Sequence, residues 1–311
     1  MQRLLPAAPW CVSEPQFSVR VTIATANNPL TSFAKEILLM EQRTIAFIGA
    51  GNMARSIIAG LVESGYPADK ITAVNRTPEK SAAFRETFGT NANEDGIESA
   101  KQAEVVVLGV KPQGMEELLA SMQDVDWSNK LAISVAAGIS VSRLSEMAGT
   151  PLNLVRVMPN TPSLVGEGMS GLYAPESVSD ADRQFSGELL SAVGKICWVN
   201  EESGINGVIA AAGSAPAYFF LFMEAMQKEA ERQGFDKQTA RELVQQAALG
   251  AAKMVVANPD IELATLREQV TSKGGTTAEA LNVFNNKQLT ETVSEAMQAA
   301  VRRAEEMESL F

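Results

Sequence analysis

Two adjacent glycines and two adjacent threonines interrupt an otherwise helical part of the chain, in the stretch "QVTSKGGTTAEALNVF" (269–284). Gly274 and Gly275 permit backbone conformations that other residues avoid, and they let a ligand approach the main chain closely. Thr276 is followed three residues later by Glu279, a capping-box pattern that predicts a helix with Thr276 as its cap. Free N–H groups at a helix N-terminus bind anions. The stretch is therefore either a plain capped turn or a carboxylate-binding site.

A second glycine-rich turn lies near the start of the chain, in "RTIAFIGAGNMARSIIAGLVESG" (43–65). Gly49 and Gly51 open a G-x-G-x-x-A pattern, with a strand predicted before it and an amphipathic helix after it. Such glycines let a pyrophosphate approach the backbone and lie on the helix N-terminus. Because both flanking elements are present, the pattern predicts a dinucleotide site rather than a tight turn without ligand. Its predicted contacts are Gly49, Ala50, Gly51, Asn52 and Met53.

The next predicted strand, Ile71 to Val74, indicates which dinucleotide binds. An NAD site usually places Asp or Glu after this strand, whereas an Arg accommodates the 2′-phosphate of NADP. Here Asn75 and Arg76 offer donors and a positive charge without a carboxylate. They favour NADP, although a solvated Arg in a loop is the alternative.

Further strands are predicted at Glu104–Val110, Leu131–Val135, Asn153–Met158 and Lys195–Val199. Continuous apolar runs of this kind are typical of parallel strands buried on both faces of a sheet. Ligands lie beyond the carboxyl ends of such strands. Lys111 is then either a catalytic lysine or, as we prefer, a charge on the cofactor side. The predicted cofactor contacts here are Val110, Lys111, Pro112, Ala136, Ala137, Gly138 and Asn160.

Long Ala-rich helices follow from about Glu201. The pattern predicts helices from Pro216 to Gln233, from a cap at Asp236 toward Val256, and from Leu289 to Leu310, with one more after the Gly-Gly-Thr-Thr turn. The stretch "AYFFLFMEAM" is apolar nearly all round, which predicts burial on several sides. This helical part is a candidate subunit interface.

Composition excludes several classes of function. The net charge of −11 argues against a nucleic-acid partner. The chain has no histidine and only two cysteines, which excludes a Ser-His-Asp hydrolase, a disulfide framework and the usual metal-ligand spacings. No apolar run approaches the 18 residues or more of a membrane span. We expect a cytoplasmic enzyme with neither a metal nor a membrane partner.

Three parts are expected along the chain. Residues 1–39 are proline-rich without sustained periodicity and are predicted to be a dispensable, disordered extension. Residues 40–202 form the expected dinucleotide-binding domain. Residues 203–311 form the expected helical substrate-binding and dimerisation domain.

Taken together, the motifs "FIGAGNMA", "VKP", "AAG", "MPNTP", "GSAPAY" and "GGTT" with the trailing "AEALNVF" resemble the pyrroline-5-carboxylate reductases over residues 43–308. The resemblance implies an α/β fold, with an N-terminal Rossmann-type doubly wound sheet followed by an all-helical C-terminal dimerisation domain. It implies reduction of 1-pyrroline-5-carboxylate to L-proline, the last step of proline biosynthesis. It also implies a nicotinamide cofactor, for which Asn75 and Arg76 favour NADPH over the alternative NADH, and a homodimer through the helical domain, often assembled into a decamer.

The resemblance also assigns roles at the opening stretch. The substrate carboxylate is held by the backbone amides of Gly274, Gly275, Thr276 and Thr277. The hydroxyl of Thr277 bonds the ring nitrogen, which makes it the candidate catalytic residue, and Ser272 lies alongside. A protonated imine with a hydroxyl partner accepts a hydride without any histidine, since hydride transfer is the cofactor's chemistry.

Three positions depart from the family pattern. Where the family usually has "SGSGPAY" this chain has "AAGSAPAY", with Ala212 and Ala215, and where it usually has "SPGGT" this chain has Lys273. Two alternatives follow: an NADP-binding sensor without turnover, and a related imine or hydroxyacid reductase that uses Lys253.

Overall fold

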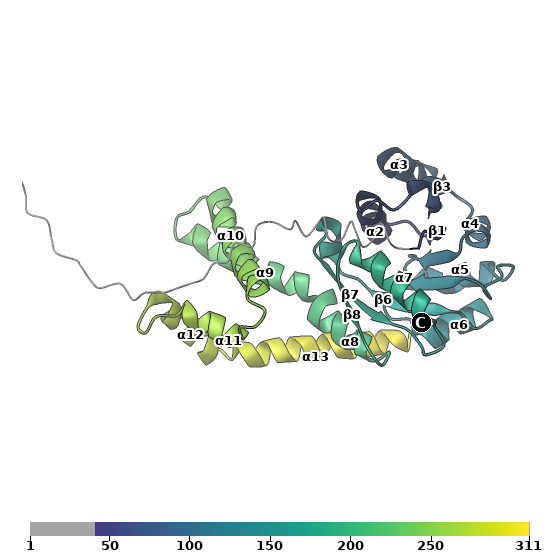
Figure 1. The fold of residues 1–311 in the computed structure, drawn as a ribbon. Helices are drawn as coiled ribbons and strands as arrows, with labels where there is room; N and C mark the ends of the chain where they lie inside the picture. The colour runs from purple at the N-terminus through teal and green to yellow at the C-terminus, as the bar shows by residue number, and fades with distance from the viewer. Residues whose placement is uncertain (1–40, 311) are drawn as a thin grey trace, which may run out of the picture.

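The computed structural model describes residues 41–310, which form a sheet flanked by helices and a separate helical half (Figure 1). The sheet order is β3-β2-β1-β4-β5-β6-β7-β8. The expectation for residues 1–39 lies outside the described residues.

The strands are β1 (Ile45–Ile48), β2 (Ile71–Val74), β3 (Asn91–Asn93), β4 (Val105–Leu108), β5 (Leu131–Ser134), β6 (Leu154–Met158), β7 (Gly168–Tyr173) and β8 (Gly194–Trp198). The α-helices among them are α2 (Asn52–Glu63), α3 (Pro78–Phe88), α4 (Gly96–Gln102), α5 (Met115–Ser121), α6 (Val141–Ala148) and α7 (Asp180–Ser191), with 3₁₀ turns η1 (Ala68–Lys70), η2 (Pro112–Gly114) and η3 (Thr161–Val165).

The first six strands are parallel, in the Rossmann order 3-2-1-4-5-6. The strand β7 is antiparallel to β6, and β8 is parallel to β7, so the last two strands run against the others. The strand predicted at Lys195–Val199 is therefore present as β8, but its place in a parallel sheet was wrong. The strands β3 and β7 were not predicted, because "NAN" is short and polar and two glycines break the apolar run of "GMSGLY".

The core fills both faces of this sheet. Ile45 and Phe47 of β1 belong to a cluster with α2 and α7, whereas Ala46 and Ile48 belong to a second cluster with α5 and α6. Successive side chains of a strand point to opposite faces, so each strand contributes to both clusters. This explains why the strands are continuous apolar runs.

The helical half contains α8 (Gly204–Val208), η4 (Ile209–Gly213), α9 (Ala215–Arg232), α10 (Lys237–Ala257), α11 (Leu263–Gln269), α12 (Thr276–Asn286) and α13 (Leu289–Glu308). The predicted helices are confirmed to within a few residues. Asp236 caps α10, since its side chain accepts hydrogen bonds from the backbone N–H groups of Gln238 and Thr239. The η4 segment is π-helical, a conformation frequent at functional sites.

The apolar helix α9 is exposed in the single chain. Phe219, Phe220 and Leu221 are 67%, 62% and 68% exposed. The predicted burial on several sides is thus not found within residues 41–310, and such a surface marks an interaction site. The stretch Gly204–Arg232 is also long and apolar enough to cross a membrane by length and composition alone, which is weak evidence because core helices pass the same test.

Candidate active site

The glycine turn between β1 and α2 leaves no room for a side chain at Gly49. Gly49 has a φ of +85°, and a Cβ there would lie 2.6 Å from Val110 Cγ1. Gly109, which we did not predict as a contact, faces it: a Cβ at Gly109 would lie 3.0 Å from the carbonyl oxygen of Gly49. Gly51 occupies the N-cap of α2 and has no side chain to cap it. Open helix N–H groups beside a close backbone approach fit a pyrophosphate.

Asn75 organises this turn from the end of β2. Its Nδ2 donates to the carbonyl oxygen of Ala50 at 3.0 Å, and its Oδ1 accepts from the backbone N–H of Thr77 at 3.0 Å. Next to it, Arg76 Nη2 lies 3.2 Å from Glu117 Oε1, and both side chains are exposed. Of the two residues predicted to contact the cofactor here, Asn75 therefore shapes the turn, and Arg76 is a cation that already has an acidic partner.

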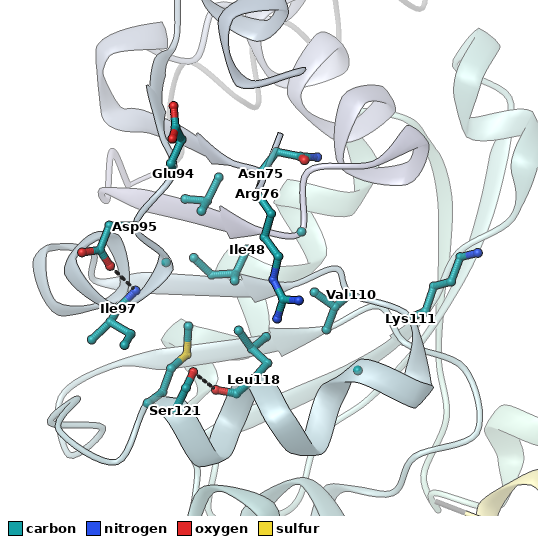
Figure 2. A pocket seen from close by; sticks show the side chains of 15 residues that line it. Ile48, Asn75, Arg76, Glu94, Asp95, Ile97, Val110, Lys111, Leu118 and Ser121 are labelled. Carbon is teal, nitrogen blue, oxygen red and sulfur yellow. Dashed lines mark hydrogen bonds between the residues drawn. The ribbon is translucent and has the colours of Figure 1, made fainter. Parts of the chain in front are cut away.

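A cavity of about 610 Å³ lies beyond the ends of β1, β2 and β4 (Figure 2). Figure 2 shows the Arg76 side chain extending across it, between Ile48 and Val110. The predicted residues in its lining are Gly49, Asn75, Arg76, Val110 and Lys111. Lining residues that the sequence did not indicate include Glu94, Asp95, Ile97, Leu118, Ser121 and Met122, which follow the unpredicted β3 or lie on α5 and after it.

A smaller hollow of about 220 Å³ lies on the other side of the glycine turn. Among the predicted contacts it is lined by Ala50, Gly51, Asn52 and Asn75, and two unpredicted cations, Arg55 and Lys80, join them. Arg55 lies over the Phe88 ring, and within residues 41–310 neither cation has an acidic partner. The position of Lys80 in the first turn of the helix after Asn75 is a local signal that could have identified it. By contrast, Met53 packs against the core.

The other predicted cofactor residues follow β4 and β5. Lys111 occupies the N-cap position of η2, where Pro112 is the first residue, and Figure 2 shows its side chain extending away from Arg76. Ala136 and Gly138 are buried, Ala137 is partly buried, and Gly138 has a φ of +73°. These residues lie at the carboxyl edge of the parallel strands, as predicted.

Both the oxygen and the nitrogen of the Asn160 side-chain amide form hydrogen bonds. Its Oδ1 accepts from the backbone N–H of Met169 at 2.9 Å, and its Nδ2 donates to the carbonyl oxygen of Ala212 in η4 at 3.1 Å. It therefore joins the end of β6 to β7 and to the π-helical turn. An apolar hollow of about 440 Å³ adjoins it, lined by Asn160, Pro162, Met169, Ala211, Ala212, Ala215, Pro216, Phe219 and Phe220. Two of the three departures from the family pattern line this hollow.

The Gly-Gly-Thr-Thr turn leads into α12, and its two threonines are the first residues of that helix. Gly274 has a φ of +71°, and a Cβ on Gly275 would lie 2.4 Å from Ser272 Oγ. The N-cap is Gly275, not Thr276, because the carbonyl oxygen of Gly275 accepts the N–H of Glu279. The predicted capping box was therefore wrong: the extended Gly275 starts the helix one residue earlier. Thr276 and Thr277 are exposed in its first turn.

One chain does not bring the two halves of the predicted site together. Figure 1 shows α11 and α12 at the far end of the helical half, away from β1 and α2. The nucleotide turn and the Gly-Gly-Thr-Thr turn thus lie on opposite parts of the described chain. Lys253, the alternative catalytic lysine, lies exposed on α10.

Comparison with known proteins identifies both halves. The family model described as pyrroline-5-carboxylate reductase dimerisation matches residues 202–307, and the one described as NADP oxidoreductase coenzyme F420-dependent matches residues 44–138. The pyrroline-5-carboxylate reductase of Vibrio alginolyticus is 63% identical over 272 residues, which cover 88% of this chain and all of the relative. That of Escherichia coli is 34% identical and covers 86% of this chain and 98% of the relative.

Solved structures give the same relationship. A pyrroline-5-carboxylate reductase from Coxiella burnetii superposes with a TM-score of 0.81 at 39% identity, covering 86% of this chain and 99% of the other. The Plasmodium falciparum enzyme, solved with NADP bound, superposes with a TM-score of 0.77 at 26% identity, covering 86% and 99%.

Proposed function

The chain belongs to the pyrroline-5-carboxylate reductase family, and from that premise we propose how its residues reduce 1-pyrroline-5-carboxylate to L-proline with NADPH. It is an NAD(P)H-dependent oxidoreductase of proline biosynthesis. The proposal rests mainly on the glycine turn at the carboxyl edge of the parallel sheet, where a side chain at Gly49 or at Gly109 would crowd the facing backbone. NADPH supplies the hydride when it is bound.

The cofactor is held by the first half of the chain. Gly49, Ala50, Gly51 and Asn52 receive the pyrophosphate on the N-terminus of α2, and Asn75 keeps this turn in shape. The 610 Å³ cavity takes the adenosine, because its apolar floor of Ile48, Val110 and Leu118 suits a base and it lies beside the turn. Arg76, Lys80 and Arg55 are the cations within reach of a 2′-phosphate. The loop Ala136–Gly138 and Asn160 lie toward the nicotinamide.

The substrate is held by the turn before α12. The N–H groups of Gly274 to Thr277 receive its carboxylate, since a helix N-terminus favours an anion. Lys273 adds a positive charge beside it. The Thr277 hydroxyl accepts the hydrogen of the protonated ring nitrogen and thereby orients the imine carbon.

The two halves meet between subunits. Because the Gly-Gly-Thr-Thr turn is distant from the nucleotide turn in one chain, Thr277 of the partner subunit completes the site. The exposed apolar face of α9 lies within the matched dimerisation segment and forms the contact. Residues 40–202 and 203–311 then act as separate domains, in a cytoplasmic homodimer that can assemble further into a decamer.

The direct test follows NADPH absorbance after addition of pyrroline-5-carboxylate. Rapid oxidation with formation of proline supports the function, whereas tight NADPH binding without oxidation across a panel of cyclic imines supports the sensor alternative. Loss of turnover in Lys253→Ala with normal turnover in Thr277→Ala would support the lysine-dependent reductase.

Mixed dimers test the shared site. Gly51→Val blocks the cofactor approach without a clash in the protein, since the nearest atom to a Cβ there is 3.9 Å away. If each site joins two subunits, co-refolding Gly51→Val with Thr277→Ala restores about one quarter of the sites, because half of the randomly formed twofold dimers are mixed and each has one intact site. No restoration would show that each site is built from one chain.

A further inference from the structure

A charged side chain lies in the middle of the apolar strand β6. Arg156 is 1% exposed; its Nη1 lies 2.9 Å from Glu202 Oε1 and its Nη2 lies 2.8 Å from Glu308 Oε1. A buried charge is tolerated only when it is paired and hydrogen-bonded, and here both carboxylates serve as partners. Arg156 thus imposes a fixed position on two residues that are distant in sequence.

The two carboxylates come from different parts of the fold. Glu202 precedes α8, and its Oε1 also accepts the backbone N–H of Val141, the first residue of α6, at 2.8 Å. Glu308 is the last residue of α13. Arg156 therefore connects the start of α6, the entry to the helical half and the end of α13.

The last turn of α13 also contacts the loop before α6. A Cβ on Gly138 would lie 2.9 Å from the Cβ of Met307, the neighbour of Glu308. Gly138 has a φ of +73° and belongs to the Ala136–Gly138 loop that we place toward the nicotinamide. The end of α13 thus packs directly on a cofactor loop.

The helix α13 spans the distance between the two halves. Its 20 residues correspond to about 30 Å. Figure 1 shows it extending from α11 and α12 toward the sheet, where its last turn lies beside α6. One helix therefore starts next to the element that carries the Gly-Gly-Thr-Thr turn and ends at the cofactor loop.

We propose that Glu308 is a positioning residue: through Arg156 it holds the end of α13 against the Ala136–Gly138 loop and so sets the position of that loop for the cofactor. This inference rests on the proposed cofactor site. Glu308 touches neither cofactor nor substrate, and its effect passes through Arg156 and Met307. None of the short motifs that carry the family resemblance includes it.

Glu308→Ala tests the proposal, because it removes one carboxylate and leaves Arg156 paired with Glu202. Glu306→Ala is the matched control, since Glu306 lies on the same helical turn and pairs with the exposed Arg303. Hydrogen–deuterium exchange of the cofactor-free protein is the first readout. We expect exchange at residues 136–141 to accelerate about tenfold in Glu308→Ala, the size of effect that a lost charge-assisted hydrogen bond produces.

The second readout separates KM from kcat. We expect Glu308→Ala to raise the KM for NADPH about tenfold, with kcat at saturating NADPH within about twofold of the wild type. Glu308→Gln keeps an acceptor for Arg156 and should recover most of the loss, and Glu306→Ala should match the wild type.

Two results would overturn the proposal. One is unchanged exchange at residues 136–141 together with an unchanged KM for NADPH. The other is a fall in melting temperature with faster exchange throughout the chain, which would make Glu308 a general stabiliser. Failure of the proposed function is a separate result: the wild type itself would then not oxidise NADPH, whereas the exchange readout would still test the contact.

Discussion

The pair formed by Arg76 and Glu117 makes a specific prediction about cofactor selectivity. The two side chains are 78% and 75% exposed and 3.2 Å apart, and Arg76 lines the cavity. A 2′-phosphate has to compete with the Glu117 carboxylate for the Arg76 guanidinium. Removing the charge in Glu117→Gln should therefore strengthen binding of any ligand that carries this phosphate.

The magnitude follows from the exposure of the pair. Exposed ion pairs contribute about 0.2–1 kcal/mol, because water and salt screen them. At about 1.4 kcal/mol per tenfold change in affinity, Glu117→Gln should tighten binding by at most about fivefold. Arg76→Gln should act in the opposite direction and more strongly: a lost hydrogen bond to a charged group is worth about 1.5–3 kcal/mol, or about tenfold or more.

Calorimetric titration with 2′,5′-ADP and 5′-AMP measures this effect, since the two ligands differ only in the 2′-phosphate. Glu116→Gln is the control, because the neighbouring Glu116 pairs with Arg143 instead. The reasoning fails if Glu117→Gln changes both ligands equally or neither. If Arg76→Gln leaves 2′,5′-ADP binding unchanged, the phosphate lies with Arg55 and Lys80 on the other side of the glycine turn.

Three further predictions concern turnover, acid stability and the first residues. Thr277→Ala should lower kcat by about ten- to a hundredfold, because a hydrogen bond to a charged partner is lost. NADPH affinity should stay the same, and Thr277→Ser should recover activity. Full turnover in Thr277→Ala would remove the Thr277 hydroxyl from the mechanism. Burial raises the pKa of Asp182, but hydrogen bonds, led by that from Arg43, outweigh it and leave the pKa below its ordinary value. This stabilisation is present above the unfolded pKa of about 4 and is lost as pH falls through the lower folded pKa. The free energy of urea unfolding should therefore fall less steeply with decreasing pH in Asp182→Asn than in the wild type, and equal slopes would contradict this prediction. A chain that starts at Met40 should keep the melting temperature and activity of the full chain, and a large drop in either would show that the preceding residues pack on it.

Local patterns in the sequence were sufficient for the features that depend on a few neighbouring residues. The glycine turn at Gly49 follows from spacing within one strand–turn–helix unit, and the cap at Asp236 follows from its place before a helix. The left-handed conformation of Gly274 is of the same kind. The family resemblance also rests on such short motifs, so it does not depend on the fold.

Other features depend on contacts that no local pattern records. The reversed direction of β7 follows from the way the chain turns back after β6 through a connection too short for a parallel crossover. The choice of Gly275 over Thr276 as the cap of α12 depends on the path of the preceding turn. The separation of the two turns in one chain follows from the course of α9 to α13 away from the sheet. Arg156 and Glu308 are 152 positions apart, and only the packing of α13 against β6 makes them partners. A buried charge requires charged or hydrogen-bonding partners because its surroundings have low polarity, and that environment exists only once the chain has folded.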